Sequence, residues 1–306
     1  MDDKLIQLKG VTKRFGKNTV LDSIDLDIPE DKITGIIGAS GEGKSTILKM
    51  IASFYKPTSG KILYFNRDIF KDTMNIKRSF GLAIEGGSFY ENLTVKENLV
   101  YFGRLYHVSK KVLFPRVEGL MKFVGLSRAE DVLAKNLSLG MKKRLDIACA
   151  LVHNPHVLIL DEPTADLDPL LRFQIMKLVK KINSHGTTIV FTTQLLSEAD
   201  KICDKVAILY NEKIIEQESS SKLKSKYKSN DLDGVFRKIF SKKGRKTYQE
   251  SIHKKTKFEE PSHEGGAAMF GGDEKKDSND SITREELEEV FASKKNKKHK
   301  KKGGTE

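Results

Sequence analysis

The stretch GASGEGKS, residues 38–45, decides the fold of this chain. It fits the pattern G-x-x-x-x-G-K-[ST] in full. It overlaps the end of an apolar run, ITGIIGAS (33–40), and it precedes the helical pattern STILKMIASFY (45–55). A glycine-rich loop between a strand and a helix presents backbone N–H groups and the positive end of the helix dipole to an anion. The stretch therefore predicts a phosphate-binding loop in an α/β protein.

Individual residues of this loop have separate expected roles. The glycines Gly38, Gly41 and Gly43 allow the backbone N–H groups to curve around phosphate oxygens. Lys44 is expected to reach the β- and γ-phosphates of a nucleotide, and the Ser45 hydroxyl is expected to ligate Mg²⁺. The other residues predicted to line the nucleotide are Ala39, Ser40, Glu42 and Thr46.

Short β-branched runs recur after the loop, in HVLILDEPT (156–164), TTIVFTT (187–193) and KVAILY (205–210). Continuous apolarity of this kind is typical of strands covered on both faces. Helical patterns lie between the runs. In the first of these patterns the apolar residues on one side are Ile47, Leu48, Met50, Ile51 and Phe54. Strands alternating with helices predict a largely parallel sheet in an α/β fold.

HVLILDEPT supplies the second half of a nucleotide site. Four apolar residues are followed directly by Asp161 and Glu162. The strand is expected to deliver Asp161 to the magnesium shell, and Glu162 stands where it can polarise a water molecule as a base. An apolar strand that ends in two acids is commonly structural, but after a complete phosphate loop it indicates a Walker B pair.

Residues 86–155 read as mostly helical, which predicts a helical insertion within the α/β core. TVKE (94–97) has the form of a helix capping box. DLDGVFRKIF (231–240) has apolar residues at helical spacing and is expected to close the folded part. The prediction is one domain over residues 1–240.

Residues 241–306 are expected to form a disordered, Lys-rich tail, because Lys, Glu, Ser and Gly dominate there. SITREELEEVFAS (281–293) is a candidate for one more short helix. Residues 221–306 hold 23 Lys and Arg against 15 Asp and Glu, so they carry +8 of the net charge of +13. Seven lysines lie in KKNKKHKKK (294–302) alone.

The sequence contains no apolar run of the roughly 18 to 20 residues needed to span a bilayer, and its first residues form no apolar signal segment. Its two cysteines, Cys149 and Cys203, match no metal-ligand spacing and cannot form a disulfide framework. These observations favour a soluble, unexported, cytoplasmic protein.

LSLGMKKRLDIACAL (137–151) carries the family resemblance. It is similar to the signature segment of ATP-binding cassette (ABC) proteins, and it stands between the phosphate loop and the Walker B pair, where that family has it. The resemblance extends from residue 4 to about 240. It implies a P-loop ABC ATPase core with a mostly parallel sheet, an N-terminal antiparallel β portion and a helical subdomain at about 86–155.

The resemblance also implies further site residues and ATP as the nucleotide. Ser138 and Gly140, with the N-terminus of the following helix, would contact the γ-phosphate bound by a second subunit. Phe15 in RFG (14–16) stands where an aromatic ring stacks on adenine. Asp168 in ADLDP (165–169) resembles the D-loop residue that lies across the dimer interface.

Two positions depart from the usual family pattern. Glu85 replaces the glutamine of the Q-loop, and together with the wording SLGMKKRL it resembles the bacitracin and lantibiotic branch of ABC-2 type exporters. Glu85 can still offer an oxygen to Mg²⁺ or to the attacking water. Gln194 in TTQLLSEAD (192–200) replaces the histidine that reaches the γ-phosphate. We therefore expect hydrolysis with Glu162 as the main base and with Glu85 and Gln194 as auxiliary catalytic residues, at a reduced rate.

The resemblance implies the ATP-hydrolysing subunit of an ABC exporter, which pairs as a homodimer or with a related subunit and drives a membrane permease on a separate chain at the cytoplasmic face. Two alternatives stay open: a soluble ABC ATPase without a transport role, and an ATP-gated regulator with weak hydrolysis. The Lys-rich tail is a candidate for contact with an anionic membrane surface, and nucleic acid is not the expected partner. The transported substrate is not encoded in this chain, and the direction of transport rests on family analogy.

Overall fold

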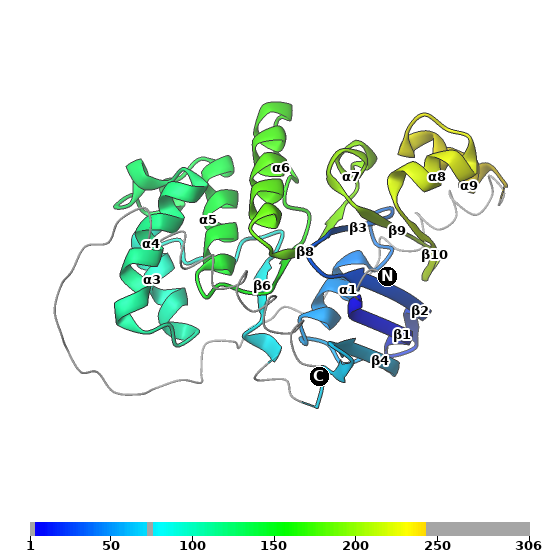
Figure 1. Cartoon of the computed structure of the whole chain (residues 1–306), viewed down its shortest axis with the longest axis horizontal. Helices are drawn as coiled ribbons and strands as arrows, with labels where there is room; N and C mark the ends of the chain where they lie inside the picture. Colours follow the sequence, from blue (N-terminus) through cyan, green and yellow to red (C-terminus); the bar gives the residue numbers. More distant parts are fainter. Residues whose placement is uncertain (1–3, 72–75, 243–306) are drawn as a thin grey trace, which may run out of the picture.

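The computed structural model describes residues 4–71 and 76–242. Within them, two β-sheets lie side by side, with helices at both ends of the molecule (Figure 1). One end is formed by α3, α4 and α5, and the other by α8 and α9 (Figure 1). The α/β fold class predicted from the sequence is confirmed. The predictions for the tail, including the helix at 281–293, fall outside the described residues.

The central sheet has the strand order β10-β9-β3-β8-β7-β6. Five of its strands are mutually parallel, and only β10 runs antiparallel to its neighbour β9. The four strand predictions in this sheet are confirmed. The strands are β3 (Ile33–Ile37), β6 (Phe80–Ala83), β7 (Val157–Leu160), β8 (Thr188–Thr193), β9 (Lys205–Tyr210) and β10 (Lys213–Glu218). Their parallel direction brings the ends of β3, β7 and β8 to one edge, where the residues that follow them meet.

Helices cover this sheet because their apolar faces are buried against it. The helix α9 shows the expected spacing, with Leu232, Val235 and Ile239 buried. The covering helices include α1 (Lys44–Ile51), α6 (Pro169–Ser184), α7 (Leu196–Ile202), α8 (Ser220–Tyr227) and α9 (Leu232–Lys242), and α5 (Leu139–Leu151) packs against β6. None of the helices in residues 4–71 and 76–242 combines the length and the apolarity needed to cross a membrane.

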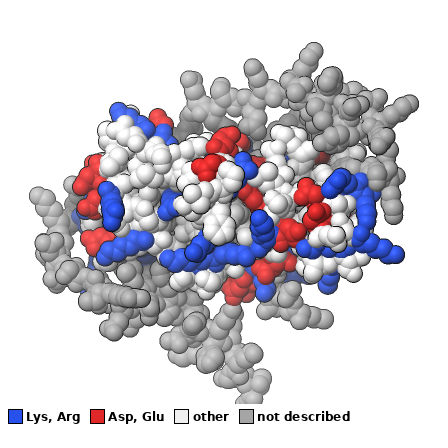
Figure 2. All heavy atoms as spheres, turned by 90° about the horizontal axis from the view of Figure 1, so that it is seen from above, with Lys and Arg blue, Asp and Glu red and all other residues white. Residues whose placement is uncertain are grey.

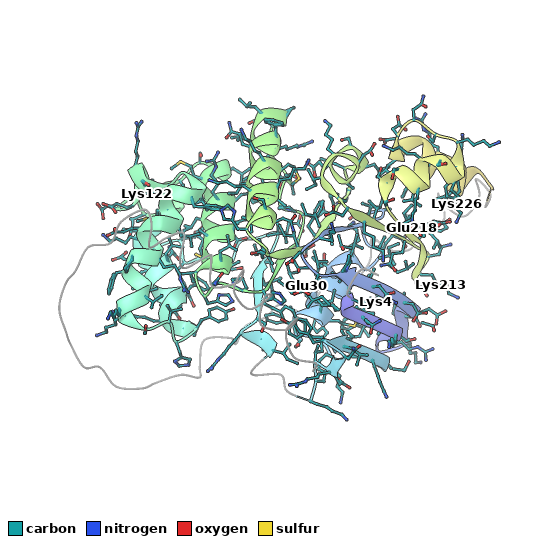
Figure 3. All side chains as sticks on the ribbon, viewed as in Figure 1. Lys4, Glu30, Lys122, Lys213, Glu218 and Lys226 are labelled. Carbon is teal, nitrogen blue, oxygen red and sulfur yellow. The ribbon has the colours of Figure 1, made fainter. Side chains whose placement is uncertain are left out.

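The second sheet is the predicted N-terminal antiparallel portion, with the strand order β2-β1-β4-β5. Its strands are β1 (Lys4–Phe15), β2 (Asn18–Pro29), β4 (Ser59–Tyr64) and β5 (Arg67–Asp68). It is joined to the edge of the central sheet near β10, where the Asp22 backbone N–H donates to the Glu212 carbonyl oxygen at 2.8 Å. Lys213 pairs with the Asp22 carboxylate at 3.2 Å across the same junction (Figure 3).

The helical part lies between β6 and β7 in the sequence, within the range predicted for the insertion. It contains α3 (Val95–Leu105), α4 (Lys110–Val124), α5 (Leu139–Leu151) and the 3₁₀ turns Ser127–Ala129 and Ala134–Asn136. The capping box at the start of α3 is confirmed, because the Glu97 N–H donates to the Thr94 hydroxyl oxygen and the Thr94 N–H donates to the Glu97 carboxylate. Leu145 and Ala148 of α5, and Val152 at its C-terminal cap, are fully buried.

One core prediction is wrong. Phe54 is 64% exposed, whereas Ile47, Leu48, Met50 and Ile51 are buried. The helix α1 ends at Ile51, and Ser53 adopts a left-handed conformation with φ of 62°. The helical periodicity therefore stops before Phe54, and the chain turns this ring away from the core.

Candidate nucleotide-binding site

The predicted phosphate loop connects β3 to α1, and its backbone requires glycine at two positions. Gly43 has φ of 103°, a left-handed conformation that side-chain-bearing residues rarely adopt. A Cβ atom on Gly38 would lie 2.7 Å from the Leu209 carbonyl oxygen of β9. The loop is therefore packed closely against the sheet, and its amide groups stand before the N-terminus of α1.

Lys44 is buried, and its Nζ atom faces back into the loop. It donates to the carbonyl oxygens of Gly38 and Ala39, at 3.1 Å in both cases. The same Nζ atom lies 3.3 Å from Oε1 of Glu162. The two residues are 118 positions apart in sequence, yet the structure brings them into one buried ion pair. The ammonium group is thus already placed beside the cradle that phosphate oxygens would enter.

Ser45 and Asp161 form a second pair at the end of β7. The Ser45 hydroxyl donates to Oδ1 of Asp161 at 3.1 Å. Thr192, at the end of the neighbouring strand β8, donates its hydroxyl to the same oxygen at 2.6 Å. A hydroxyl and a carboxylate oxygen at a phosphate loop are hard-oxygen ligands of the kind that Mg²⁺ takes alongside nucleotide phosphates. The donor set of these residues therefore fits Mg²⁺.

Glu162 is held in a strained backbone conformation, with φ of 45°. Its N–H donates to the Thr192 hydroxyl oxygen at 3.0 Å, and its Oε2 atom accepts a hydrogen bond from the Gln194 backbone N–H at 3.3 Å. These contacts, with the Lys44 ion pair, fix the carboxylate between the phosphate loop and the segment after β8. The Gln194 side chain itself is exposed.

The sequence analysis missed two residues that hold this region together. Thr192 bridges Asp161 and Glu162, as described above. Glu198 of α7 is buried, and its Oε2 atom accepts hydrogen bonds from the hydroxyls of Thr164 at 2.8 Å and Thr193 at 2.9 Å. The available signal was the pair of threonines at the end of the predicted strand TTIVFTT (187–193).

Glu85 lies two residues beyond β6, which pairs with β7. The Asp161 N–H donates to the Ala83 carbonyl oxygen at 2.9 Å, so the chain that carries Glu85 leaves the sheet directly beside Asp161. The Glu85 side chain is exposed. Within the described residues its carboxylate makes no hydrogen bond to Asp161 or Ser45. The structure therefore brings the backbone of Glu85 to the site and leaves its carboxylate directed to solvent.

Phe15 lies at the end of β1, where its ring is 42% exposed. The edge of the ring meets Tyr55, with centroids 5.3 Å apart, and the Lys13 Nζ atom lies 4.7 Å from its centroid. The remaining loop residues differ in exposure. Glu42 is buried, Ser40 and Gly41 are exposed, and Ala39 and Thr46 are half-buried.

Ser138 and Gly140 lie at the N-terminus of α5 in the helical part. Ser138 is the N-cap, and its hydroxyl oxygen accepts a hydrogen bond from the Met141 N–H at 3.4 Å. Asp168 caps α6 in the same way, accepting from the N–H groups of Leu170 and Leu171. Within residues 4–71 and 76–242 no hydrogen bond joins these three residues to the phosphate loop of the same chain.

Comparisons with known proteins identify the family. The family model described as ABC transporter matches residues 21–165. The daunorubicin/doxorubicin resistance ATP-binding protein DrrA of Streptomyces peucetius is 36% identical over 229 residues, which are 75% of this chain and 69% of that protein. The chain belongs to the ATP-binding proteins of ABC transporters. The bacitracin transport ATP-binding protein BcrA of Bacillus licheniformis is 35% identical over 214 residues, 70% of this chain and 69% of the relative.

Solved structures of the same family share the fold. The ATP-binding subunit of an ABC transporter aligns with a TM-score of 0.70 at 25% identity, over 77% of this chain and 99% of that one. The cbiO1 protein of Clostridium perfringens, part of the ABC transporter complex cbiONQ, aligns with a TM-score of 0.68 at 27% identity, over 83% of this chain and 100% of that one. The predicted family and fold are confirmed, and the chain is an ATPase that uses ATP and Mg²⁺.

Proposed function

We propose that this ATPase powers an exporter whose membrane permease is a separate chain. The observation that carries the proposal is the convergence of Lys44, Ser45, Asp161 and Glu162 at one edge of the sheet, in a chain similar to transport ATPases. Similar proteins are described as acting in daunorubicin resistance, bacitracin transport and Nod factor export. A methionine import protein of Histophilus somni is also 37% identical, so the support for export is the similarity to the Nod factor export protein and to the resistance proteins, and not the fold.

The site residues receive the following roles. The backbone N–H groups of the loop and the Lys44 ammonium bind the phosphates, and Ser45 and Asp161 hold the cation. Bound Mg²⁺ supplies positive charge that neutralises the phosphate oxygens as the γ-phosphoryl group is transferred to water. Glu162 accepts a proton from the attacking water, because its carboxylate is already fixed beside Lys44. Glu85, which follows β6, and Gln194, which follows β8, act as auxiliary catalytic residues on either side of β7.

A second copy of this chain, or a related subunit, completes the site. Ser138 and Gly140 make no hydrogen bond to their own phosphate loop, yet Ser138 is exposed at a helix N-terminus, which is suited to an anion. In a head-to-tail pair, this end of α5 faces the nucleotide on the partner's loop, and the Asp168 turn lies at the same interface. Closing the pair moves the helical part that carries α5.

Purification of a tagged copy from detergent-solubilised membranes tests the partner. We expect a polytopic membrane protein to be recovered in stoichiometric amount, because the family converts ATP hydrolysis into movement of a permease. An unrelated soluble protein with the same tag is the control. Recovery of the chain without any membrane protein would favour the soluble, non-transport ATPase.

The Lys-rich tail is proposed as a second, weaker membrane contact. Figure 2 shows Lys and Arg side chains along one edge of the described molecule and again at the end formed by α8 and α9, with Asp and Glu side chains between the two groups. Lysines of α8 are already paired there: Lys222 with Glu218, Lys224 with Asp200 and Lys226 with Glu216. Glu218 and Lys226 are labelled in Figure 3. Residues 243–306 hold 16 Lys and Arg against 13 Asp and Glu, a net charge of +3, and their concentrated positive charge is the run of seven lysines at 294–302. Each lysine near an anionic surface contributes on the order of 1 kcal/mol.

Removal of residues 243–306 is expected to weaken sedimentation with anionic vesicles at low salt while sparing ATP hydrolysis, because it leaves every described helix intact. A second variant with glutamine in place of the seven lysines of 294–302 keeps the chain length and isolates the charge. Co-sedimentation with phosphatidylserine vesicles, and with neutral vesicles as the control, provides the measurement. Equal sedimentation of the wild-type and both variants would exclude the tether.

The regulator with weak hydrolysis is the second candidate, favoured by Gln194 in the place of the family's histidine. Such a regulator would have the same ATP site as a transport ATPase and would differ from it in the rate of ATP hydrolysis. The rate of phosphate release in the wild-type and in a Gln194 variant separates the two.

A further inference from the structure

Two charged side chains are buried on α5 outside the nucleotide site. Lys143 is 9% exposed and Asp146 is 3% exposed. They lie three positions apart, on the same face of the helix. Both contact the segment that follows β6. The Lys143 Nζ atom donates to the Glu85 carbonyl oxygen at 3.0 Å, and Oδ1 of Asp146 accepts from the Ser88 backbone N–H at 2.7 Å.

Burying the charged side chains of Lys143 and Asp146 costs free energy of desolvation, which apolar residues at these positions would not cost. Burial raises the pKa of Asp146 to about 6, because it disfavours the charged form, and the hydrogen bonds from Ser88 and the positive charge of Lys143 offset part of this rise. Buried charged groups, even when they are partnered, rarely stabilise a fold more than well-packed apolar residues do. Lys143 and Asp146 therefore contribute chiefly by holding the segment after β6 in place, and not by stabilising the fold.

The segment between the two contacts is intrinsically pliable. It contains Gly86 and Gly87, and Gly87 has φ of 83°. A Cβ atom on Gly86 would meet nothing within 4 Å, so close packing does not fix this position. Two consecutive glycines give the backbone more freedom than any other pair. Within the segment the Gly87 N–H donates to the Ile84 carbonyl oxygen at 3.0 Å, and the contacts with Lys143 and Asp146 fasten both ends of the glycine pair to α5.

The segment also connects two parts of the proposed mechanism. At one end, the Ala83 carbonyl oxygen accepts the hydrogen bond from the Asp161 N–H, two residues before Glu85. At the other end, α5 begins at the Ser138 cap, which we assign to the partner's nucleotide. The Lys143 contact therefore joins α5 to the backbone of Glu85.

We propose that Lys143 and Asp146 are positioning residues that fasten the Glu85–Ser88 segment to α5. Through this clamp the backbone of Glu85 is held beside the ATP site, and it moves together with α5 when two subunits close and the Glu85 side chain turns toward the nucleotide. The inference rests on the auxiliary role proposed for Glu85. It adds that this role depends on two charged residues of the signature-like helix, neither of which touches the nucleotide.

Steady-state ATP hydrolysis by Asp146→Ala, Asp146→Asn and Lys143→Met tests the clamp. Asp146→Ala and Lys143→Met are expected to lower kcat by about tenfold and leave KM for ATP within about threefold, because the clamp acts on the transition state rather than on binding. Asp146→Asn keeps an oxygen that accepts from Ser88 and is expected to recover most of the rate. Lys142→Met is the matched control: this neighbouring lysine pairs with Glu91 at 3.6 Å, and its loss is expected to change nothing.

A double-mutant cycle with Glu85→Ala distinguishes positioning from a general loss of structure. In that background Asp146→Ala is expected to have no further effect on kcat, because the group it positions is gone. If the fold-reductions in kcat caused by Glu85→Ala and Asp146→Ala multiply in the double variant, the clamp is overturned. It is also overturned if Asp146→Asn is as slow as Asp146→Ala at a temperature where circular dichroism shows that both are folded. If Glu85→Ala alone leaves hydrolysis unchanged, the role assigned to Glu85 fails instead. If Glu85→Ala slows hydrolysis and Asp146→Ala does not, only the clamp fails.

Discussion

Glu162→Gln is expected to form a stable dimer in ATP and Mg²⁺, whereas Lys44→Ala is expected to bind no ATP. The difference follows from what each residue contacts. Lys44 is the buried cation beside the carbonyl oxygens of Gly38 and Ala39, so its removal takes the positive charge out of the phosphate cradle. Glu162 contributes a base, and its amide replacement keeps the shape while losing the ability to accept a proton. Loss of such a base typically lowers the rate by about 10²- to 10⁴-fold.

The ion pair between Lys44 and Glu162 gives a second reason for the different behaviour of the two variants. The Lys44 Nζ atom and Oε1 of Glu162 are 3.3 Å apart and buried, so Glu162 competes with phosphate for the ammonium group. Glutamine at position 162 removes the negative charge from this competition. ATP affinity in the variant is therefore expected to equal or exceed that of the wild-type, while phosphate release nearly stops.

Size-exclusion chromatography with and without ATP and Mg²⁺ measures the association, and equilibrium binding of a fluorescent ATP analogue measures affinity. Wild-type protein without nucleotide and Lys44→Ala with ATP serve as the monomer references. An unchanged elution volume of Glu162→Gln in ATP would argue against a pair of identical chains. Addition of a related subunit would then be the next experiment, because a heterodimer predicts that the shift appears only with that partner.

The phosphate loop could be predicted from sequence because it is a local feature. Its glycines, Lys44 and Ser45 act through backbone geometry at the junction of one strand and one helix, and both elements have clear patterns. Asp161 and Glu162 follow a run of four apolar residues and were predicted for the same reason. Where the local pattern was extended too far, as at Phe54, the prediction failed, because nothing in the apolar spacing marks the end of α1.

The contacts that lie between distant segments could not be predicted. A parallel sheet was expected, but its strand order, which places β8 beside β7, was not encoded in any single stretch. Thr192 reaches Asp161 only because of that order. Similarly, Lys143 and Asp146 have the appearance of solvent-exposed helix residues in sequence, and only the packing of α5 against the segment after β6 reveals that they are buried.

Gln194→His is expected to raise the maximal rate of phosphate release by about tenfold or more and to leave ATP affinity within a few-fold. The position lies directly beside the proposed base, because the Gln194 backbone N–H donates to Oε2 of Glu162 at 3.3 Å. Its side chain is exposed, so it can turn toward a nucleotide without leaving a packed environment. A histidine here offers an imidazole donor at the point where charge develops on the γ-phosphate.

The size of this effect follows from what such a donor contributes. One donor to a developing negative charge is typically worth roughly 2.7 to 4 kcal/mol, or about 10²- to 10³-fold in rate. The Gln194 amide keeps an N–H donor of similar reach, so only part of that range is missing in the wild-type. Because the contact strengthens in the transition state, the gain should appear in kcat and not in binding.

Phosphate release by the purified wild-type and variant, measured side by side at saturating ATP, tests the prediction. Gln194→Ala is the matched control, since it removes the amide and is expected to slow the enzyme further. The backbone N–H that contacts Glu162 is present in all three proteins, so a difference among them reports on the side chain at position 194 alone. If the wild-type is briskly active and the histidine variant is no faster, the glutamine amide already supplies the stabilisation assigned to imidazole. If the wild-type is slow and the histidine variant is faster, glutamine at position 194 slows hydrolysis and so prolongs the ATP-bound state of this chain.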